Sequence, residues 1–89
     1  MDDRDIRLEQ AFASMKYMGE QIHVRRTKLK KSIAEISFVT GLSRDDVFKI
    51  ECGVDTGNAA DVMVVANVLG IDYFDLLKDA LEHGKKIQE

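Results

Sequence analysis

The chain has neither proline nor tryptophan, and it has one cysteine and two histidines among its 89 residues. The absence of proline, with only six glycines, is typical of helices joined by short turns. Cys52 cannot form a disulfide within the chain, so a disulfide-held fold is excluded and a reducing, cytoplasmic environment is expected. We interpret Cys52 as a half-buried side chain near a helix end, with a redox role as the alternative.

Long apolar runs and catalytic motifs are missing as well. No segment of ~18 uncharged apolar residues occurs, so we expect no contact with a membrane, and the acidic start does not resemble a secretory signal. His23 and His83 are far apart, and neither has metal-ligand spacing with Cys52. We therefore expect no metal, no other cofactor and no enzymatic activity.

The net charge of −3 is unevenly distributed along the chain. Residues 1–21 carry −2, residues 22–49 carry +4, and residues 50–89 carry −5. Phosphate groups respond to the local potential rather than to the total charge. The middle third of the chain is therefore the candidate electrostatic face.

Apolar periodicity and turn residues predict an all-α fold. We expect helices over 3–17, 18–30, 32–40, 43–52, 59–69 and 73–83, the first two either kinked at Gly19 or continuous. Residues 1–17 form an N-terminal helical extension, 18–83 the domain, and 84–89 a tail that Gly84 separates from the last helix. The side chains expected to face inward from the first two helices are Ile6, Phe12, Ala13, Met15, Met18, Ile22 and Leu29.

The segment from Ile33 to Gly53 has the spacing of a helix-turn-helix, at about residues 32–52. Two short helices that cross closely need a small side chain at the crossing, which Ser37 supplies, and a turn residue able to adopt positive φ, which is Gly41. Ser32 with Glu35, and Ser43 with Asp46, have the serine-to-acid spacing of helix N-termini. The expected inward apolar side is formed by Ile36, Val39 or Thr40, Leu42, Val47 and Ile50.

These residues resemble the Cro/phage-repressor-type helix-turn-helix family, also called XRE. The resemblance runs over about 18–77 and is carried by Met18-Gly19, Ile22, Arg25-Arg26, Leu29, Ser32, Thr40-Gly41-Leu42-Ser43-Arg44, Val47, Ile50-Glu51, Gly53, Val62, Val65-Ala66, Leu69-Gly70-Ile71 and Leu76-Leu77. It implies a five-helix lambda-repressor-like domain, a homodimer, double-stranded DNA as the partner, and a recognition helix from Ser43 to about Cys52 in the major groove. Residues 1–17 have no counterpart in the family's core.

The resemblance also implies roles for individual residues. Arg26 is expected to pair with Glu51 and tie helices together, with a phosphate contact as the alternative. The candidate DNA-binding residues are Lys30, Lys31, Ser32, Ser43, Arg44, Asp45, Phe48, Lys49 and Asn58. Arg44 is the best candidate for a guanine edge, whereas Lys30 and Lys31 either meet phosphate or form a solvated face.

Four residues depart from the family's pattern on this face. Ile33 replaces a common DNA-contacting glutamine, and Asp45 and Asp46 either stabilise the helix start and accept from cytosine, or mark a surface that no longer binds DNA. Phe48 can contact a thymine methyl, pack on a partner protein, or tuck into the domain. The alternative functions are a protein-interaction module for a basic partner and an antitoxin that represses its own operon.

The helix expected over 59–69 is apolar nearly all round. Its apolar residues are Val62, Met63, Val64, Val65, Ala66, Val68 and Leu69. A helix that is apolar on every side is buried on every side, so a dimer interface is expected there, with Tyr73, Phe74 and the N-terminal helix available to it. The alternative is that Val64 and Val68 are scattered surface side chains.

Overall fold

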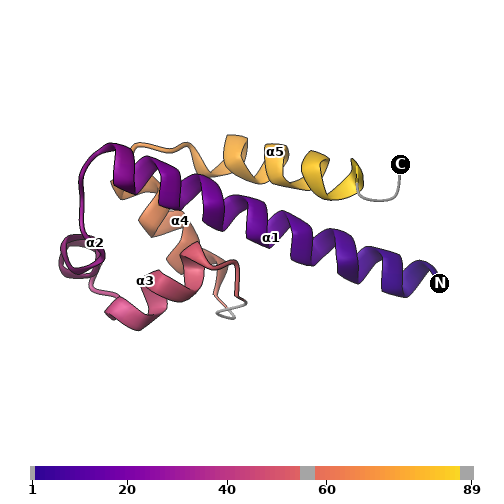
Figure 1. Ribbon diagram of the computed structural model, residues 1–89, viewed down its shortest axis with the longest axis horizontal. Helices are drawn as coiled ribbons and strands as arrows, with labels where there is room; N and C mark the ends of the chain where they lie inside the picture. Colours follow the sequence, from indigo (N-terminus) through magenta and orange to yellow (C-terminus); the bar gives the residue numbers. More distant parts are fainter. Residues whose placement is uncertain (1, 55–57, 87–89) are drawn as a thin grey trace.

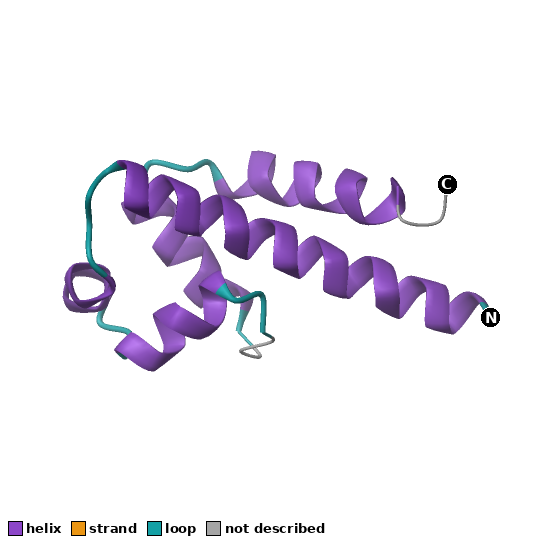
Figure 2. Cartoon of the chain, in the orientation of Figure 1, coloured by secondary structure: helices purple, strands orange, loops and turns teal. Residues whose placement is uncertain are grey.

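The computed structural model describes residues 2–54 and 58–86, and in these ranges it is all-helical, as expected, with no strand. The five helices are α1 (Asp3–Lys28), α2 (Ile33–Thr40), α3 (Arg44–Glu51), α4 (Ala59–Val68) and α5 (Tyr73–Lys85), drawn in Figures 1 and 2. No helix in these ranges has the length and apolar character needed to cross a bilayer.

Helix α1 is a single 26-residue helix, so of the two alternatives at Gly19 the continuous one is correct. Its start is fixed by Asp2, whose carboxylate accepts hydrogen bonds from the backbone N–H groups of Arg4 and Asp5 at 2.9 and 3.0 Å. Acidic residues in the first turn and basic residues in the last turn complement the helix dipole. Leu29 caps the end of the helix, and Lys30 has a left-handed backbone with φ 57°.

The core lies between the C-terminal half of α1 and the other four helices. Its buried side chains are Met18, Ile22, Ile36, Val47, Ile50, Val65, Ala66, Leu69, Leu76 and Ala80. Helix α1 packs mainly against α5 and also against α3, while α4 contacts α2 and α5. The molecule is elongated, 43 × 21 × 17 Å, because the N-terminal half of α1 and the neighbouring α5 project beyond the other helices (Figure 1).

Two of the expected inward positions, Phe12 and Leu29, are exposed. Phe12 is 61% exposed because α5 packs against this part of α1 at Gln10 and Ser14, and Phe12, two residues from each, lies on the other side of the helix. Leu29 is exposed because it follows the last turn of α1. Between the alternatives Val39 and Thr40, the half-buried side chain is Thr40. Its hydroxyl donates to the carbonyl of Ile36 at 2.7 Å, which satisfies the polar group locally.

The last helix is longer than predicted, and the placement of Gly84 beyond it was wrong. Helix α5 continues to Lys85, and Gly84 is buried against α1. A Cβ at this position would lie 2.5 Å from the carbonyl oxygen of Gln10 and would also clash with the hydroxyl of Ser14. Glycine is therefore required for a close helix crossing rather than for a helix end.

A second close approach joins α1 to α3. A Cβ at Gly19 would lie 2.6 Å from the carbonyl oxygens of both Ile50 and Glu51. These are backbone atoms at the end of α3, so they cannot move aside as a flexible side chain does. The missing side chain at Gly19 thus sets how closely α3 lies against α1.

The substitution Gly19→Ala tests this contact. Alanine stabilises an unhindered helix by ~1 kcal/mol relative to glycine, whereas overpacking costs about 1–3 kcal/mol. Because the atoms met are backbone, the cost lies in the upper part of this range, and we expect a net loss of about 1–2 kcal/mol in the free energy of unfolding, measured by chemical denaturation. Glu20→Ala, at the exposed neighbouring position, is the control and should change stability little. A Gly19→Ala protein as stable as the wild type would show that the two backbones are not held this closely.

Candidate functional site

The start of α2 combines free backbone amides with positive charge. Ser32 accepts from the N–H of Glu35 at 3.0 Å, and the Glu35 carboxylate accepts from the N–H of Ser32 at 3.1 Å, which confirms the predicted capping box. The remaining first-turn amides point out of the helix end. Lys30 and Lys31 directly precede it, both exposed, and Lys31 lies 3.8 Å from Glu35 in an exposed ion pair. Such a pair restrains the lysine weakly.

The turn between α2 and α3 has the predicted geometry. Gly41 has φ 79°, which glycine adopts without steric cost. The hydroxyl of Ser37 donates to the carbonyl of Leu42 at 2.6 Å, and the N–H of Leu42 donates to the hydroxyl of Thr40 at 3.2 Å. With Val47 fully buried, these contacts fix the angle between the two helices.

Helix α3 presents a mixed polar and aromatic outer face. Ser43 caps it by accepting from the N–H of Asp46 at 3.0 Å. Four exposed residues follow on its outer side: Arg44, Asp45, Phe48 and Lys49. Phe48 is 54% exposed, so it does not tuck into the domain. Its two other expected roles, contact with a thymine methyl group and packing on a partner protein, remain.

Two cations on α3 differ in their surroundings. The ammonium group of Lys49 lies 3.0 Å from the carboxylate of Asp45, whose hydrogen bond and charge raise the pKa of Lys49. Arg44 has no ion pair among the described residues. Arg44 is therefore the cation on this face that is available to a ligand without breaking an existing pair.

The opposite side of α3 is held to α1 by an ion pair, as the resemblance implied. Arg26 donates from Nε and Nη2 to the two carboxylate oxygens of Glu51 at 2.7 and 3.0 Å, and both side chains are largely buried. Its third donor, Nη1, bonds to the carbonyl of Lys31 at 2.8 Å. One guanidinium thus joins the end of α3 to the loop that begins α2.

His23 adds a contact that sequence reasoning did not find. Its Nδ1 lies 2.6 Å from Glu51 Oε1, and because a carboxylate only accepts, Nδ1 carries the proton. Burial opposes ionisation of Glu51, but the hydrogen bonds from Arg26 and His23 outweigh it and lower the pKa of this carboxyl group. In the sequence, the position of His23 one helical turn before Arg26 is the signal that could have predicted its contact with Glu51.

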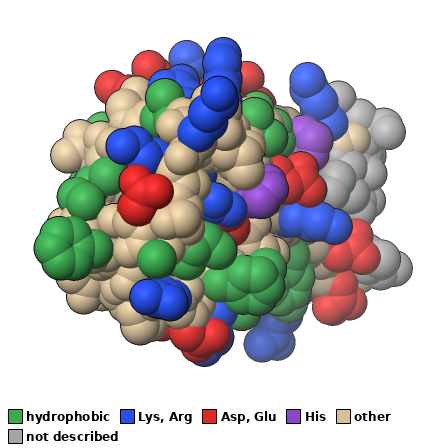
Figure 3. All heavy atoms as spheres, turned by 60° about the vertical axis from the view of Figure 1, so that its left-hand side comes forward, with side chains coloured by type: hydrophobic (Ala, Val, Ile, Leu, Met, Phe, Trp, Pro, Cys, Tyr) green, Lys and Arg blue, Asp and Glu red, His purple; other side chains and the backbone are tan. Residues whose placement is uncertain are grey.

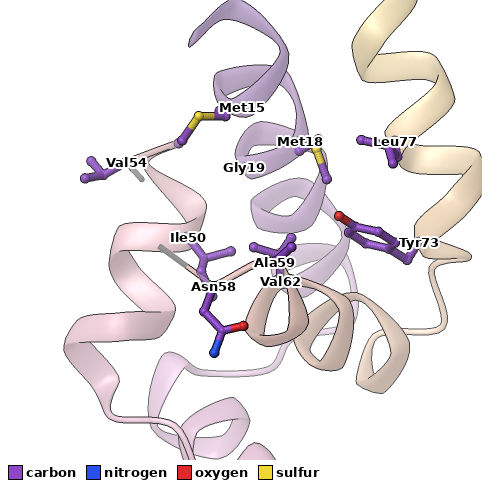
Figure 4. A pocket seen from close by; sticks show the side chains of 11 residues that line it. Met15, Met18, Gly19, Ile50, Val54, Asn58, Ala59, Val62, Tyr73 and Leu77 are labelled. Carbon is purple, nitrogen blue, oxygen red and sulfur yellow. The ribbon is translucent and has the colours of Figure 1, made fainter. Parts of the chain in front are cut away.

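The last candidate, Asn58, lies apart from the face that carries Arg44. It caps α4 by accepting from the N–H of Ala60 at 2.9 Å, and it lines a cavity of about 440 Å³ between α1, α3, α4 and α5 (Figure 4).

Of the loop 53–58, residues 55–57 fall outside the described residues, as do 87–89 of the expected tail. Cys52 is exposed rather than half-buried.

The surface around α2 is mixed rather than uniformly basic. Figure 3 shows Lys and Arg side chains interspersed with hydrophobic and acidic ones on the face that the left-hand side of Figure 1 presents. On α2, Phe38 is 89% exposed and Val39 is also exposed, and sequence reasoning singled out neither as a surface contact.

Among the residues that the structure describes, no group of three or more His, Cys, Asp or Glu side chains is arranged to hold a metal ion.

Comparison of the chain with protein-family models, with curated proteins and with solved structures finds no match. What this surface binds is therefore inferred from its own residues.

The pH dependence of stability tests the contact at Glu51. A carboxyl group with a lowered pKa contributes stability that is present above its ordinary pKa and is lost as the pH falls through the lowered one. Glu51→Gln should remove much of this acid-side loss and should cost ~3 kcal/mol at pH 7, because Arg26 keeps its charge without a partner. Urea denaturation at several pH values measures both effects.

Glu35→Gln is the matched control, since glutamine also completes a capping box. It should leave stability at pH 7 and the shape of the pH profile nearly unchanged. Equal behaviour of the two variants would contradict the role given to Glu51.

Proposed function

We propose that this chain is a sequence-specific, double-stranded-DNA-binding transcriptional regulator, a repressor that acts as a homodimer, with a lambda-repressor-like helix-turn-helix domain of the XRE type. The observation that supports this best is the exposed Arg44, which has no ion pair within the described ranges 2–54 and 58–86. It lies on a short helix whose inner side is fixed by Val47, Ile50 and the Arg26–Glu51 pair. A rigid helix with a polar outer face is what the major groove accommodates.

Phosphate contacts in this proposal come from the start of α2. Its first-turn amides and the positive end of the helix dipole attract an anion, and Lys30 and Lys31 add mobile positive charge beside them. Arg26 supports this site indirectly by holding the carbonyl of Lys31. Such contacts set the position of the protein on the duplex but do not select a sequence.

Base contacts come from the outer face of α3. Arg44 would donate two hydrogen bonds to a guanine edge, Phe48 would contact a thymine methyl group, and Asp45 would accept from a cytosine amino group. Asp45 already pairs with Lys49 at 3.0 Å, so the two residues act together on the duplex rather than as independent contacts. The two carboxylates at the start of α3 therefore favour some sequences instead of abolishing binding.

A homodimer would present two copies of α3 to two half-sites about one helical turn apart. Occupation of such an operator blocks access to a promoter, which is the basis of repression. Exposed apolar side chains for self-association occur on α4, namely Met63, Val64 and Val68, and on α1 and α5. In the antitoxin variant of this function, the regulated promoter would be that of a toxin operon.

The second candidate function is a protein-interaction module, which the exposure of Phe38 favours. A phenylalanine 89% exposed on α2, next to the exposed Val39, is not needed for a phosphate contact. Together with Phe48 and Asp45, it would suit a basic partner protein with an apolar patch. Binding of DNA and binding of such a partner compete for α3 in this alternative.

The substitution Arg44→Ala tests the base contact. Fluorescence anisotropy with a labelled duplex from the region upstream of the chain's own gene should show a loss of ~1–3 kcal/mol in specific binding, with unchanged stability. Lys86→Ala removes one exposed cation at the end of α5 and is the control. Wild-type binding should weaken with added salt; nanomolar binding independent of salt, or equal loss in both variants, would contradict the proposal.

The substitution Asp45→Asn tests whether the ion pair with Asp45 keeps Lys49 from contacting DNA phosphates. Lys49 would be released from its 3.0 Å pair, so nonspecific DNA affinity should rise and the slope of log K against log salt should steepen by up to ~0.9. Asp79→Asn, on α5, makes the same charge change at an exposed position and should alter neither quantity. If Asp45→Asn leaves both unchanged, α3 does not lie against phosphates.

A further inference from the structure

A cavity of about 440 Å³ lies where α1, α3, α4 and α5 meet, and Figure 4 shows its lining. Each of these helices contributes an apolar side chain to the wall, namely Met18, Ile50, Val62 and Leu77. None of the described residues that line the cavity is charged. An apolar cavity of about 150 Å³ holds a benzene ring, so this one has room for two fused rings with a substituent.

The cavity cannot close by a movement of α3 toward α1, because the two backbones are already in contact beside it. A Cβ at Gly19 would lie 2.6 Å from the carbonyl oxygen of Ile50, and one at Gly53 would lie 2.6 Å from the Cα atom of Lys16. Both glycines line the cavity. A cavity whose walls are fixed in this way is preformed, as ligand sites usually are.

One polar side chain projects among these apolar walls. Figure 4 shows Tyr73 reaching from α5 toward Met18 with its hydroxyl end foremost. This hydroxyl donates to none of the described residues, so it can donate a hydrogen bond to a bound molecule. Asn58, the other polar side chain among the described lining residues, already caps α4 with its amide oxygen.

The lining fits a flat, neutral molecule better than a charged one. The thioethers of Met15 and Met18 make favourable contacts with aromatic rings, and the ring of Tyr73 can pair with another ring edge to face or offset. A charged group would lose its hydration, and the described lining offers no opposite charge to replace it. The ligand class that these features select is a neutral bicyclic aromatic molecule with one hydrogen-bond acceptor.

We infer that this cavity binds a small neutral aromatic molecule that accepts a hydrogen bond from Tyr73 and packs its rings between Met18, Val62 and Leu77. The site is separate from the start of α2 and the outer face of α3, and the inference does not depend on contact with DNA. A bound molecule would also contact Ile50 and Gly53 at the end of α3, so it would stabilise the packing of α3 against α1.

Binding of Prodan, a neutral naphthalene ketone whose emission shifts to shorter wavelength in apolar surroundings, tests this site. The wild-type protein should bind it with a dissociation constant below about 1 mM. Tyr73→Phe removes the hydroxyl and keeps the ring, so it should weaken binding about three- to tenfold. Absence of the emission shift in the wild type, or unchanged affinity in Tyr73→Phe, would overturn the inference.

Filling the cavity gives a second test with a matched control. Val62→Phe places a ring in the cavity, so it should weaken Prodan binding at least about tenfold while the helical circular dichroism is retained. Val64→Phe makes the same change on the exposed side of α4 and should bind the probe as the wild type does. Equal affinities of these two variants would show that the probe binds elsewhere, which contradicts the inference.

Nuclear magnetic resonance of the wild-type protein locates the probe without any substitution. Addition of Prodan should shift the methyl resonances of Ile50, Val62 and Leu77, whereas those of Val64 and Val68 should stay in place. Shifts confined to the exposed methyl groups of α4 would mean adsorption to a surface patch and would overturn the inference.

Discussion

The contact between α1 and the end of α3 is the constraint on which the rest of the structure depends. Gly19 lets the backbone of α3 approach α1, and the paired hydrogen bonds from Arg26 to Glu51 fix the orientation of that approach. The same guanidinium holds the carbonyl of Lys31, so the start of α2 is positioned by the residue that positions the end of α3. Because a largely buried ion pair is costly to break by removal of one partner, α1, α2 and α3 behave as one unit.

That unit turns two different surfaces outward. One is the start of α2, where amides and lysines suit a phosphate. The other is the outer side of α3, where Lys49 is paired with Asp45 and Arg44 has no ion pair with any described residue. The acidic residues reduce the general positive potential of the face, and they also stabilise the start of α3. Under the proposed function, such a face would rely more on selected base contacts than on uniform attraction to the DNA backbone. The proposed contact with DNA does not account for the exposure of Phe38.

The sequence was informative wherever local chemistry or fixed spacing decides the structure. The capping box at Ser32, the small residue Ser37 and the positive φ of Gly41 follow from local geometry, and the Arg26–Glu51 pair followed from the resemblance. The failures concern contacts between distant segments. Phe12 has the helical spacing of an inward side chain, but no other helix covers it. Gly84 resembles a residue that ends a helix, yet it lies within α5 and allows the close contact with α1. Neither the exposure of Phe38 nor the contact of His23 with Glu51 can be seen from one helix alone.

The most direct test of the central claim is nuclear magnetic resonance titration of the isotopically labelled protein with duplex DNA from the region upstream of its gene. The account predicts that amide shifts change chiefly in two segments, 30–35 at the start of α2 and 43–49 along α3, with the Arg44 side chain among the most affected. Residues 73–85 of α5 should change little. Shifts confined to α5, or no shifts at concentrations where a DNA-binding domain is saturated, would contradict the account.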